Sequence, residues 1–202
     1  MWRKYFGAQA TIIGADLDPR CKLYEEEGIH VETLDQSDPD MLEQLVNKYG
    51  DFDIIIDDGS HRCDHQMVSL LFLWPALNPG GVYLVEDTHT SYRSAYQGGV
   101  RARTSFVEFA KDRVDDINAF WSLDTESLQV NRFTKEMLAV SFFDSMVVFE
   151  KRITEAKEPV RLLVGTPSRE LVNVVMQQYA DTPDQIKALW GEEMWARLKR
   201  KA

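Results

Sequence analysis

Hydrophobic residues along the chain fall into short unbroken runs and longer stretches with helical spacing. The short runs are rich in β-branched residues without polar alternation, which is typical of strands buried on both faces in a parallel sheet. Strands are predicted in this way at 11–16, 29–34, 52–56 and 81–85. Helical spacing is found at 2–6, 19–27, 39–49, 64–74 and 101–120. Strands that alternate with helices predict an α/β fold with a mostly parallel sheet.

Two later runs follow a different pattern. Residues 139–143 and 146–150 are separated only by Asp144 and Ser145, which predicts an antiparallel hairpin at one edge of the sheet. A chain of 202 residues is long enough for one domain with a hydrophobic core. We therefore expect one domain over 1–154 and a helical C-terminal extension over 155–202 that packs on it or beside it.

Ionisable residues gather where two of the predicted strands end. Asp57, Asp58 and His61 follow the third strand, and Glu86 and Asp87 follow the fourth. Parallel strands present their carboxyl ends at one edge of a sheet, where open α/β folds bind ligands. Carboxylate oxygens suit a hard cation such as Mg²⁺, and a nearby imidazole can accept a proton at neutral pH. The alternative is that these acids only cap helices and form turns.

Asp16 ends the first predicted strand. An acid in that position can accept hydrogen bonds from a ribose diol, as in nucleotide-binding α/β folds. The alternative is a helix N-cap or a turn residue, and the residue alone does not decide between them. His89 lies two residues after Asp87, so a contact with a substrate is one option for its side chain.

Composition excludes several classes of protein. The net charge of −10 argues against a nucleic-acid partner, because phosphate binding needs clustered Lys and Arg. The two cysteines, Cys21 and Cys63, form no CxxC pattern and imply neither a disulfide framework nor a zinc site. No apolar run approaches the roughly 20 residues needed to cross a membrane. These observations predict a cytoplasmic protein without membrane partners.

Several motifs together resemble those of class I S-adenosylmethionine-dependent methyltransferases. The similarity is greatest to the metal-dependent sugar O-methyltransferases of macrolide biosynthesis, of the macrocin and mycinamicin type, and it covers roughly residues 1–150. The Asp-Asp-Gly-Ser-His motif followed by Glu-Asp is its most specific part. The matching segments are 14–19, 35–38, 52–61, 78–81 and 86–88.

The resemblance implies S-adenosylmethionine and Mg²⁺ as cofactors and a role for each matched residue. Asp58, Glu86 and Asp87 would hold Mg²⁺, and His61 would be the general base for a hydroxyl of a small-molecule acceptor, expected to be a sugar of a natural product. The methyl group would then pass in line from sulfonium to oxygen. The methyl donor would contact the four residues Asp16 (ribose), Asp35 and Gln36 (adenine) and Asp57 (amino-acid end).

The chain also departs from this family. Its members have a first strand and a glycine-rich loop before the helix that matches residues 2–6. The resemblance therefore implies a Rossmann-like class I methyltransferase sheet that lacks its first, central strand. We expect an N-terminally truncated domain that binds the methyl donor weakly or not at all. Oligomeric state is left open, with a homo-oligomer among the options.

Two other functions are compatible with parts of the sequence. A catalytically inactive fragment could retain the metal-binding rim and act through association with a partner. An NAD-dependent oxidoreductase would also use Asp16 for a ribose, but the chain contains no G-x-G-x-x-G motif. The acids that follow the third and fourth strands would have no evident role in hydride transfer.

Overall fold

The computed structural model describes residues 2–159. The predicted extension over 155–202 lies outside the described residues except for 155–159, which form neither helix nor strand. The helical extension and the domain boundary before it therefore stay predictions.

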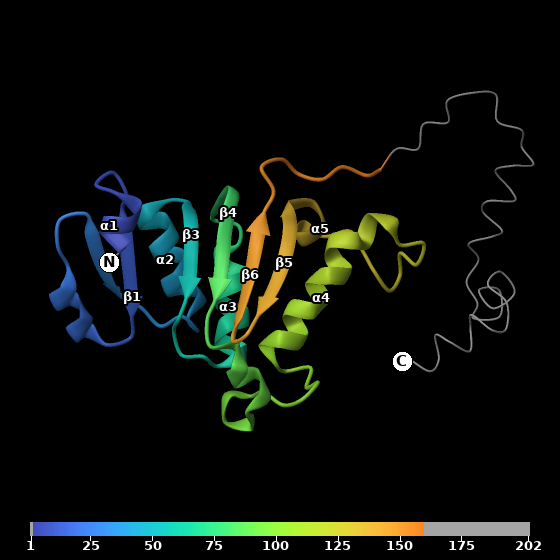
Figure 1. Cartoon of the computed structure of the whole chain (residues 1–202), viewed down its shortest axis with the longest axis horizontal. Helices are drawn as coiled ribbons and strands as arrows, with labels where there is room; N and C mark the ends of the chain where they lie inside the picture. Colours follow the sequence, from blue (N-terminus) through green and yellow to red (C-terminus); the bar gives the residue numbers. More distant parts are fainter. Residues whose placement is uncertain (1, 160–202) are drawn as a thin grey trace, which may run out of the picture. The chain divides into compact units, whose positions relative to one another are not determined.

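Within residues 2–159 the strands form two sheets (Figure 1). In the two-stranded sheet, β1 and β2 are parallel. The four-stranded sheet has the order β3-β4-β6-β5, with β3 parallel to β4 and β6 antiparallel to both of its neighbours. The predicted α/β fold with a terminal antiparallel hairpin is confirmed. The strands are β1 (Ile12–Asp16), β2 (Ile29–Thr33), β3 (Phe52–Asp57), β4 (Leu77–Val85), β5 (Met137–Phe143) and β6 (Met146–Lys151).

Among the described residues, four strand edges have no partner strand, and two of them belong to β1 and β3. Figure 1 shows β1 and β3 as the strands nearest the junction of the two sheets. Within residues 2–159, β1 pairs only with β2, and β3 pairs only with β4. Each of the two strands therefore has one edge of backbone N–H and C=O groups without a ladder partner. This arrangement agrees with the predicted sheet that lacks its central strand.

Helices alternate with the strands, and three of the five α-helices in residues 2–159 begin with a side-chain N-cap. The side chain of Asp38 accepts a hydrogen bond from Asp40 N at 2.9 Å and begins α2, with Pro39 at the first helical position as predicted. Ser105 caps α4 in the same way, so this helix begins later than the predicted residue 101. The α-helices are α1 (Trp2–Phe6), α2 (Pro39–Tyr49), α3 (Cys63–Leu73), α4 (Phe106–Asn118) and α5 (Arg132–Glu136).

Four short 3₁₀ helices lie in the described part of the chain. The segment 19–27, predicted as a helix, contains one 3₁₀ helix, and the segment 88–100, for which no helix or strand was predicted, contains two more. These are η1 (Pro19–Tyr24), η2 (Thr88–Tyr92) and η3 (Ser94–Tyr96), with a fourth, η4 (Ala119–Trp121), after α4. Of the helices in the described part of the chain, none is long and apolar enough to cross a membrane.

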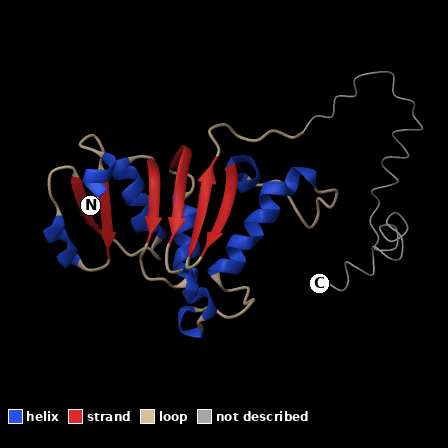
Figure 2. Ribbon diagram, viewed as in Figure 1, coloured by secondary structure: helices blue, strands red, loops and turns tan. Residues whose placement is uncertain are grey.

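The hydrophobic core lies between one face of the four-stranded sheet and the helices α3 and α4 (Figure 2). Tyr83 and Phe149 on that face are fully buried, and they share one core cluster with Leu70 of α3. The opposite face of β3 is different, because Ile54 and Ile56 are 46% and 37% exposed. The prediction that this strand is buried on both faces is therefore wrong for one face. An unbroken apolar run does not reveal which face is covered.

Candidate functional site

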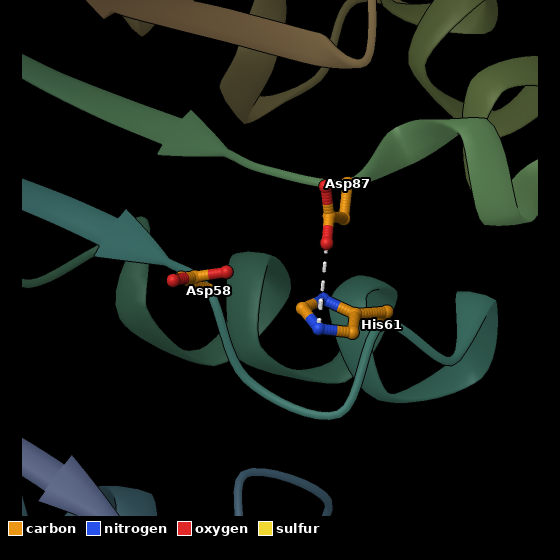
Figure 3. Close-up of side chains that lie close together, drawn as sticks. All are labelled: Asp58, His61 and Asp87. Carbon is orange, nitrogen blue, oxygen red and sulfur yellow. Dashed lines mark ion pairs between the residues drawn. The ribbon is translucent and has the colours of Figure 1, made fainter.

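Two aspartates and a histidine meet at the carboxyl ends of β3 and β4 (Figure 3). One ligand atom from each of Asp58, His61 and Asp87 lies within 4.8 Å of the other two. Nε2 of His61 is 3.6 Å from Oδ2 of Asp87. Asp58 and His61 lie in the loop between β3 and α3, and Asp87 lies between β4 and η2. The predicted convergence of these residues at one sheet edge is therefore observed, and we call the three residues the metal group.

Glu86, the third predicted metal ligand, is not a member of this group. Its backbone continues the pairing of β3 with β4, because Glu86 N donates to Asp57 O at 2.9 Å. Its backbone oxygen accepts a hydrogen bond from Nε2 of Gln66 at 3.2 Å. The role of the Glu86 carboxylate as a metal ligand stays a prediction.

The backbone of the metal group adopts an uncommon conformation. His61 has φ 59° and Asp87 has φ 51°, both in the left-handed region that non-glycine residues rarely enter. Oγ1 of Thr90 lies 2.8 Å from the backbone oxygen of His61 and 2.9 Å from that of Asp87. Thr90 is only 2% exposed. One buried hydroxyl, with a single proton that the two carbonyl oxygens share, thus contacts both left-handed residues, which come from different loops.

A second histidine approaches Asp87 from the other side. Nδ1 of His89 is 3.7 Å from Oδ1 of Asp87 and 2.6 Å from Oγ of Ser145. Ser145 lies in the turn between β5 and β6, at φ 64°. Its backbone oxygen accepts a hydrogen bond from Thr88 N at 3.0 Å. The hairpin turn therefore forms one wall of the site, and His89 lies between that wall and Asp87.

Asp57 faces the interior, beneath the metal group. Its Oδ2 accepts a hydrogen bond from the hydroxyl of Ser69 at 2.5 Å and lies 3.4 Å from Oη of Tyr83. Its Oδ1 accepts from Nε2 of Gln36 at 2.9 Å. Burial raises the pKa of this carboxyl, against the lowering effect of its hydrogen bonds. Burial, followed by the Asp57 charge, also raises the pKa of Tyr83. The predicted contact of Asp57 with the methyl donor stays a prediction.

Both polar atoms of the Gln36 side chain form hydrogen bonds within the protein. Besides Asp57, its Nε2 lies 3.3 Å from Oγ of Ser69, and its Oε1 accepts a hydrogen bond from Ser60 N at 2.5 Å. The side chain therefore joins the segment after β2 to the loop after β3. Its predicted place beside the adenine stays a prediction.

The other two residues predicted for the methyl donor lie at the ends of β1 and β2. Asp16 lines a cavity of about 300 Å³ together with Trp2, Gly14 and Tyr24. Its Oδ1 accepts a hydrogen bond from Asp18 N at 2.8 Å. Asp35 accepts hydrogen bonds from the hydroxyl and the backbone N–H of Ser37, which lower the pKa of its carboxyl. Both residues are at the edge of the sheet where a nucleotide was expected.

Sequence reasoning missed the contributions of Thr90 and Ser145. Ser145 was assigned only to the turn of the hairpin. Because β6 runs antiparallel to β4, that turn lies at the edge where β3 and β4 end, so the predicted topology contained this information. Thr90 had no comparable pattern, since its role depends on two loops meeting in space.

The metal group has the chemistry of a divalent-cation site. Two carboxylates approach one point, and hard cations such as Mg²⁺ bind carboxylate oxygens and keep several waters. Among residues 2–159, Nδ1 of His61 is buried without a hydrogen-bond partner, while Nε2 faces the acids. The residues present therefore fit a cation held by Asp58 and Asp87, with the imidazole beside it.

Comparisons with known proteins agree with this chemistry. No family model matches the chain. It is 42% identical over 120 residues to the 8-demethyl-8-α-L-rhamnosyl tetracenomycin-C 2′-O-methyltransferase of Streptomyces olivaceus, over 58% of this chain and 31% of that protein. It is 40% identical over 98 residues to the demethylmacrocin O-methyltransferase of Streptomyces fradiae, over 48% of this chain and 24% of that protein. The chain thus spans less than a third of the length of these curated relatives.

A solved structure with the same fold is the MycE methyltransferase of the mycinamycin biosynthetic pathway, in complex with Mg, SAH and mycinamycin VI. The TM-score is 0.73 at 24% identity, over 86% of this chain and 44% of that chain. These comparisons favour neither an NAD-dependent oxidoreductase nor an inactive fragment. The chain therefore has the methyltransferase fold of MycE and is related in sequence to the sugar O-methyltransferases that its motifs resemble.

Proposed function

We propose that this chain carries the metal-binding and acceptor-activating part of an S-adenosylmethionine-dependent O-methyltransferase that acts on a hydroxyl of a sugar in a natural product. The observation that carries the proposal is the metal group, in which Asp58, His61 and Asp87 converge at the edge of the sheet. Support comes from relatives that are O-methyltransferases by name and from a fold shared with a methyltransferase that binds Mg and SAH.

Asp58 and Asp87 would hold Mg²⁺, with Glu86 as the third predicted ligand. A divalent cation bound there stabilises negative charge on the oxygen of the acceptor hydroxyl. Asp87 is oriented for this role from two sides, because His61 and His89 flank its two carboxylate oxygens at 3.6 and 3.7 Å. The left-handed backbone and the Thr90 hydroxyl fix the position of Asp87 before any ligand arrives.

His61 would accept the proton of the acceptor hydroxyl at Nε2, the ring nitrogen that faces the acids. Its Nδ1 is enclosed by protein and its backbone oxygen is held by Thr90, so the ring presents one nitrogen to the site. General-base catalysis by a positioned histidine contributes typically about 10²–10⁴-fold to a rate. The remaining catalysis would come from aligning the hydroxyl with the methyl group.

S-adenosylmethionine would bind along the carboxyl ends of β1, β2 and β3. Asp16 would accept hydrogen bonds from its ribose, Asp35 and Gln36 would lie beside its adenine, and Asp57 would lie near its amino-acid end. Support for this placement is limited to position, since Asp16 lines a cavity and Asp35 lies at the adjacent strand end.

The acceptor would enter a second cavity, of about 330 Å³, beside the metal group. Thr88 and His89 connect this cavity to Asp87, and Phe143 and Tyr92 line it while remaining 59% and 56% exposed. Cavities of roughly 300–1,000 Å³ with apolar walls and a few polar groups are typical of small-molecule sites. Exposed aromatic rings give such a cavity apolar surface on which a ring system of the acceptor can pack.

Other expectations about partners stay predictions. The net charge of −10 argues against nucleic acid. A cytoplasmic location is predicted from the sequence only, and the sequence leaves the oligomeric state open, with a homo-oligomer among the options.

The proposal is tested by measuring methyl transfer and metal binding separately. Mn²⁺ binding by this chain is followed by electron paramagnetic resonance. Methyl transfer from S-adenosylmethionine to mycinamycin VI, used as a probe acceptor, is measured by mass spectrometry in a version extended by the family's first strand and glycine-rich loop, because this chain alone is expected to bind the methyl donor weakly. His61→Ala should lower methyl transfer by about 10²–10⁴-fold and retain Mn²⁺ binding. A wild-type protein that binds no Mn²⁺, or full turnover after His61→Ala, would contradict the proposal.

A further inference from the structure

We propose that Gln36 is a positioning residue, whose side chain sets the conformation of the loop that carries Asp58 and His61. The inference rests on the proposed function for its consequence, since that loop supplies two residues of the metal group. It assigns Gln36 a role within the protein in addition to its predicted place beside the methyl donor.

The amide group of Gln36 forms hydrogen bonds both with buried side chains and with the backbone of the loop that carries Asp58 and His61. Nε2 donates to Oδ1 of Asp57 at 2.9 Å and lies 3.3 Å from Oγ of Ser69, so both amide protons have acceptors. Oε1 accepts the backbone N–H of Ser60 at 2.5 Å. The side chain is thus anchored on a buried network at one end and holds the loop backbone at the other.

Gly59 fits against the same amide. A Cβ atom added at Gly59 would overlap Oε1 and the amide carbon of Gln36, and the three nearest atoms all belong to this one side chain. Gly59 is not among the residues with positive φ, so glycine is needed here for space and not for backbone conformation. The loop and the Gln36 side chain are therefore in direct contact at two successive residues.

The Gln36 contacts at Gly59 and Ser60 lie in the sequence between the two loop residues of the metal group. Asp58 precedes Gly59, and His61 follows Ser60. Because His61 has φ 59°, the loop leaves the conformation that most residues favour and needs contacts that hold it there. Gln36 supplies such contacts from the segment after β2. The end of the two-stranded sheet thereby fixes the geometry of the metal group.

The first test replaces Gln36 and measures Mn²⁺ affinity by electron paramagnetic resonance, without methyl donor or acceptor. Gln36→Ala should weaken Mn²⁺ binding by about 10-fold or more, as is usual when a residue that orients a metal ligand is removed. Tyr49→Phe is the matched control, because it removes a hydrogen bond between α2 and Glu32 of β2 without touching the loop. An equal loss of Mn²⁺ affinity in both variants would mean that Gln36→Ala acts only by lowering the stability of the fold, and it would overturn the proposal.

The second test uses the contact with Gly59. Gly59→Ala alone should weaken Mn²⁺ binding, because its methyl group displaces the Gln36 amide or the loop. In the Gln36→Ala background the same substitution should cause little further loss, since the overlapping atoms are gone. Equal losses in both backgrounds would overturn the proposal.

The two proposals can fail separately. A wild-type protein that binds no Mn²⁺ contradicts the proposed metal site. The role of Gln36 is then read from the free energies of unfolding of the wild type, the two single variants and the double variant without metal. A penalty for Gly59→Ala that disappears with Gln36→Ala supports the contact, and an additive penalty contradicts it.

Discussion

The two-stranded sheet and the four-stranded sheet differ in how deeply their residues are buried. In the four-stranded sheet, Tyr83, Val85, Val147 and Phe149 have at most 1% of their surface exposed. In the two-stranded sheet, β1 contains no buried residue and β2 contains only Val31. The 3₁₀ helix η1 between these strands leaves Leu23 and Tyr24 largely exposed.

The difference in burial between the two sheets matches the proposed locations of the metal and the methyl donor. The metal group stands on the deeply buried sheet, where strand ends, the Thr90 hydroxyl and the hairpin turn hold its residues in place. The residues predicted for the methyl donor stand mainly on the sheet with few buried side chains. We infer that the metal group is held in its binding geometry by hydrogen bonds from residues of a deeply packed sheet and its loops, and that the donor side is held mainly by local hydrogen bonds on a sheet with few buried side chains.

The largest expected effect is on metal binding. Asp87→Asn removes one of two converging carboxylates, so Mn²⁺ affinity should fall by at least about 100-fold. Asp16→Asn, on the two-stranded sheet, is the matched control and should leave Mn²⁺ affinity unchanged. Mn²⁺ titration of both variants, followed by electron paramagnetic resonance, shows which of the two sheets carries the metal site. Similar losses in the two variants would contradict the assignment of the metal to the four-stranded sheet.

The next effect is on the free energy of unfolding. The same substitution, leucine to alanine, is compared between the core beneath the four-stranded sheet and the two-stranded region. Leu70→Ala removes a side chain with no exposed surface from the core beneath the four-stranded sheet, and should cost about 2–5 kcal/mol of the free energy of unfolding. Leu23→Ala, at 86% exposure on η1, should change it by less than about 0.5 kcal/mol. Urea unfolding monitored by circular dichroism measures both. Comparable costs would show that the two regions are equally well packed.

A smaller effect is expected from Thr90. Thr90→Val keeps the shape of the side chain but removes the hydroxyl that joins His61 O to Asp87 O, at a cost of about 1–3 kcal/mol. The metal group should also lose order, so Mn²⁺ affinity should fall. Thr90→Ser retains the hydroxyl and should restore most of the affinity. Equal behaviour of the valine and serine variants would mean that the hydroxyl has no positioning role.

The smallest effect concerns pH and the two-stranded sheet. Hydrogen bonds from Ser37 hold the pKa of Asp35 below its ordinary value, so they stabilise the folded protein above the unfolded pKa of about 3.9. This contribution is lost as the pH falls through the lowered, folded-state pKa. Ser37→Ala should therefore cost less than about 1 kcal/mol at pH 7, with a difference from the wild type that shrinks on acidification. Urea unfolding at successive pH values checks the sign, and a difference that grows as the pH falls would contradict it.

Much of the site could be predicted because it follows from regular structure. Asp58 directly follows β3, Asp87 is the second residue after β4, and parallel strands place their carboxyl ends at one sheet edge. The hairpin was also predictable, since Asp144 and Ser145 are the only residues between two apolar runs. Local patterns were sufficient for the order of these strands and for the turn of the hairpin.

The remaining features depend on contacts that no local pattern contains. Gln36 reaches Ser60 across 24 positions of sequence, and Thr90 reaches His61 across 29. The exposure of Ile54 and Ile56 was missed because an apolar run has the same appearance whether one face or two faces are covered. The boundary of α4 was missed because the cap at Ser105 was not recognised.

The left-handed residues His61, Asp87 and Ser145 have a consequence for attempts to rebuild this site in another protein. Each is a non-glycine residue in a conformation that costs about 1–2 kcal/mol. Side chains placed on ordinary helices or strands would point elsewhere, because the left-handed backbone sets their direction. A designer would therefore have to transfer three loops together with the tertiary contacts that hold them. A host protein of low stability would unfold because of the conformational cost of the three left-handed residues.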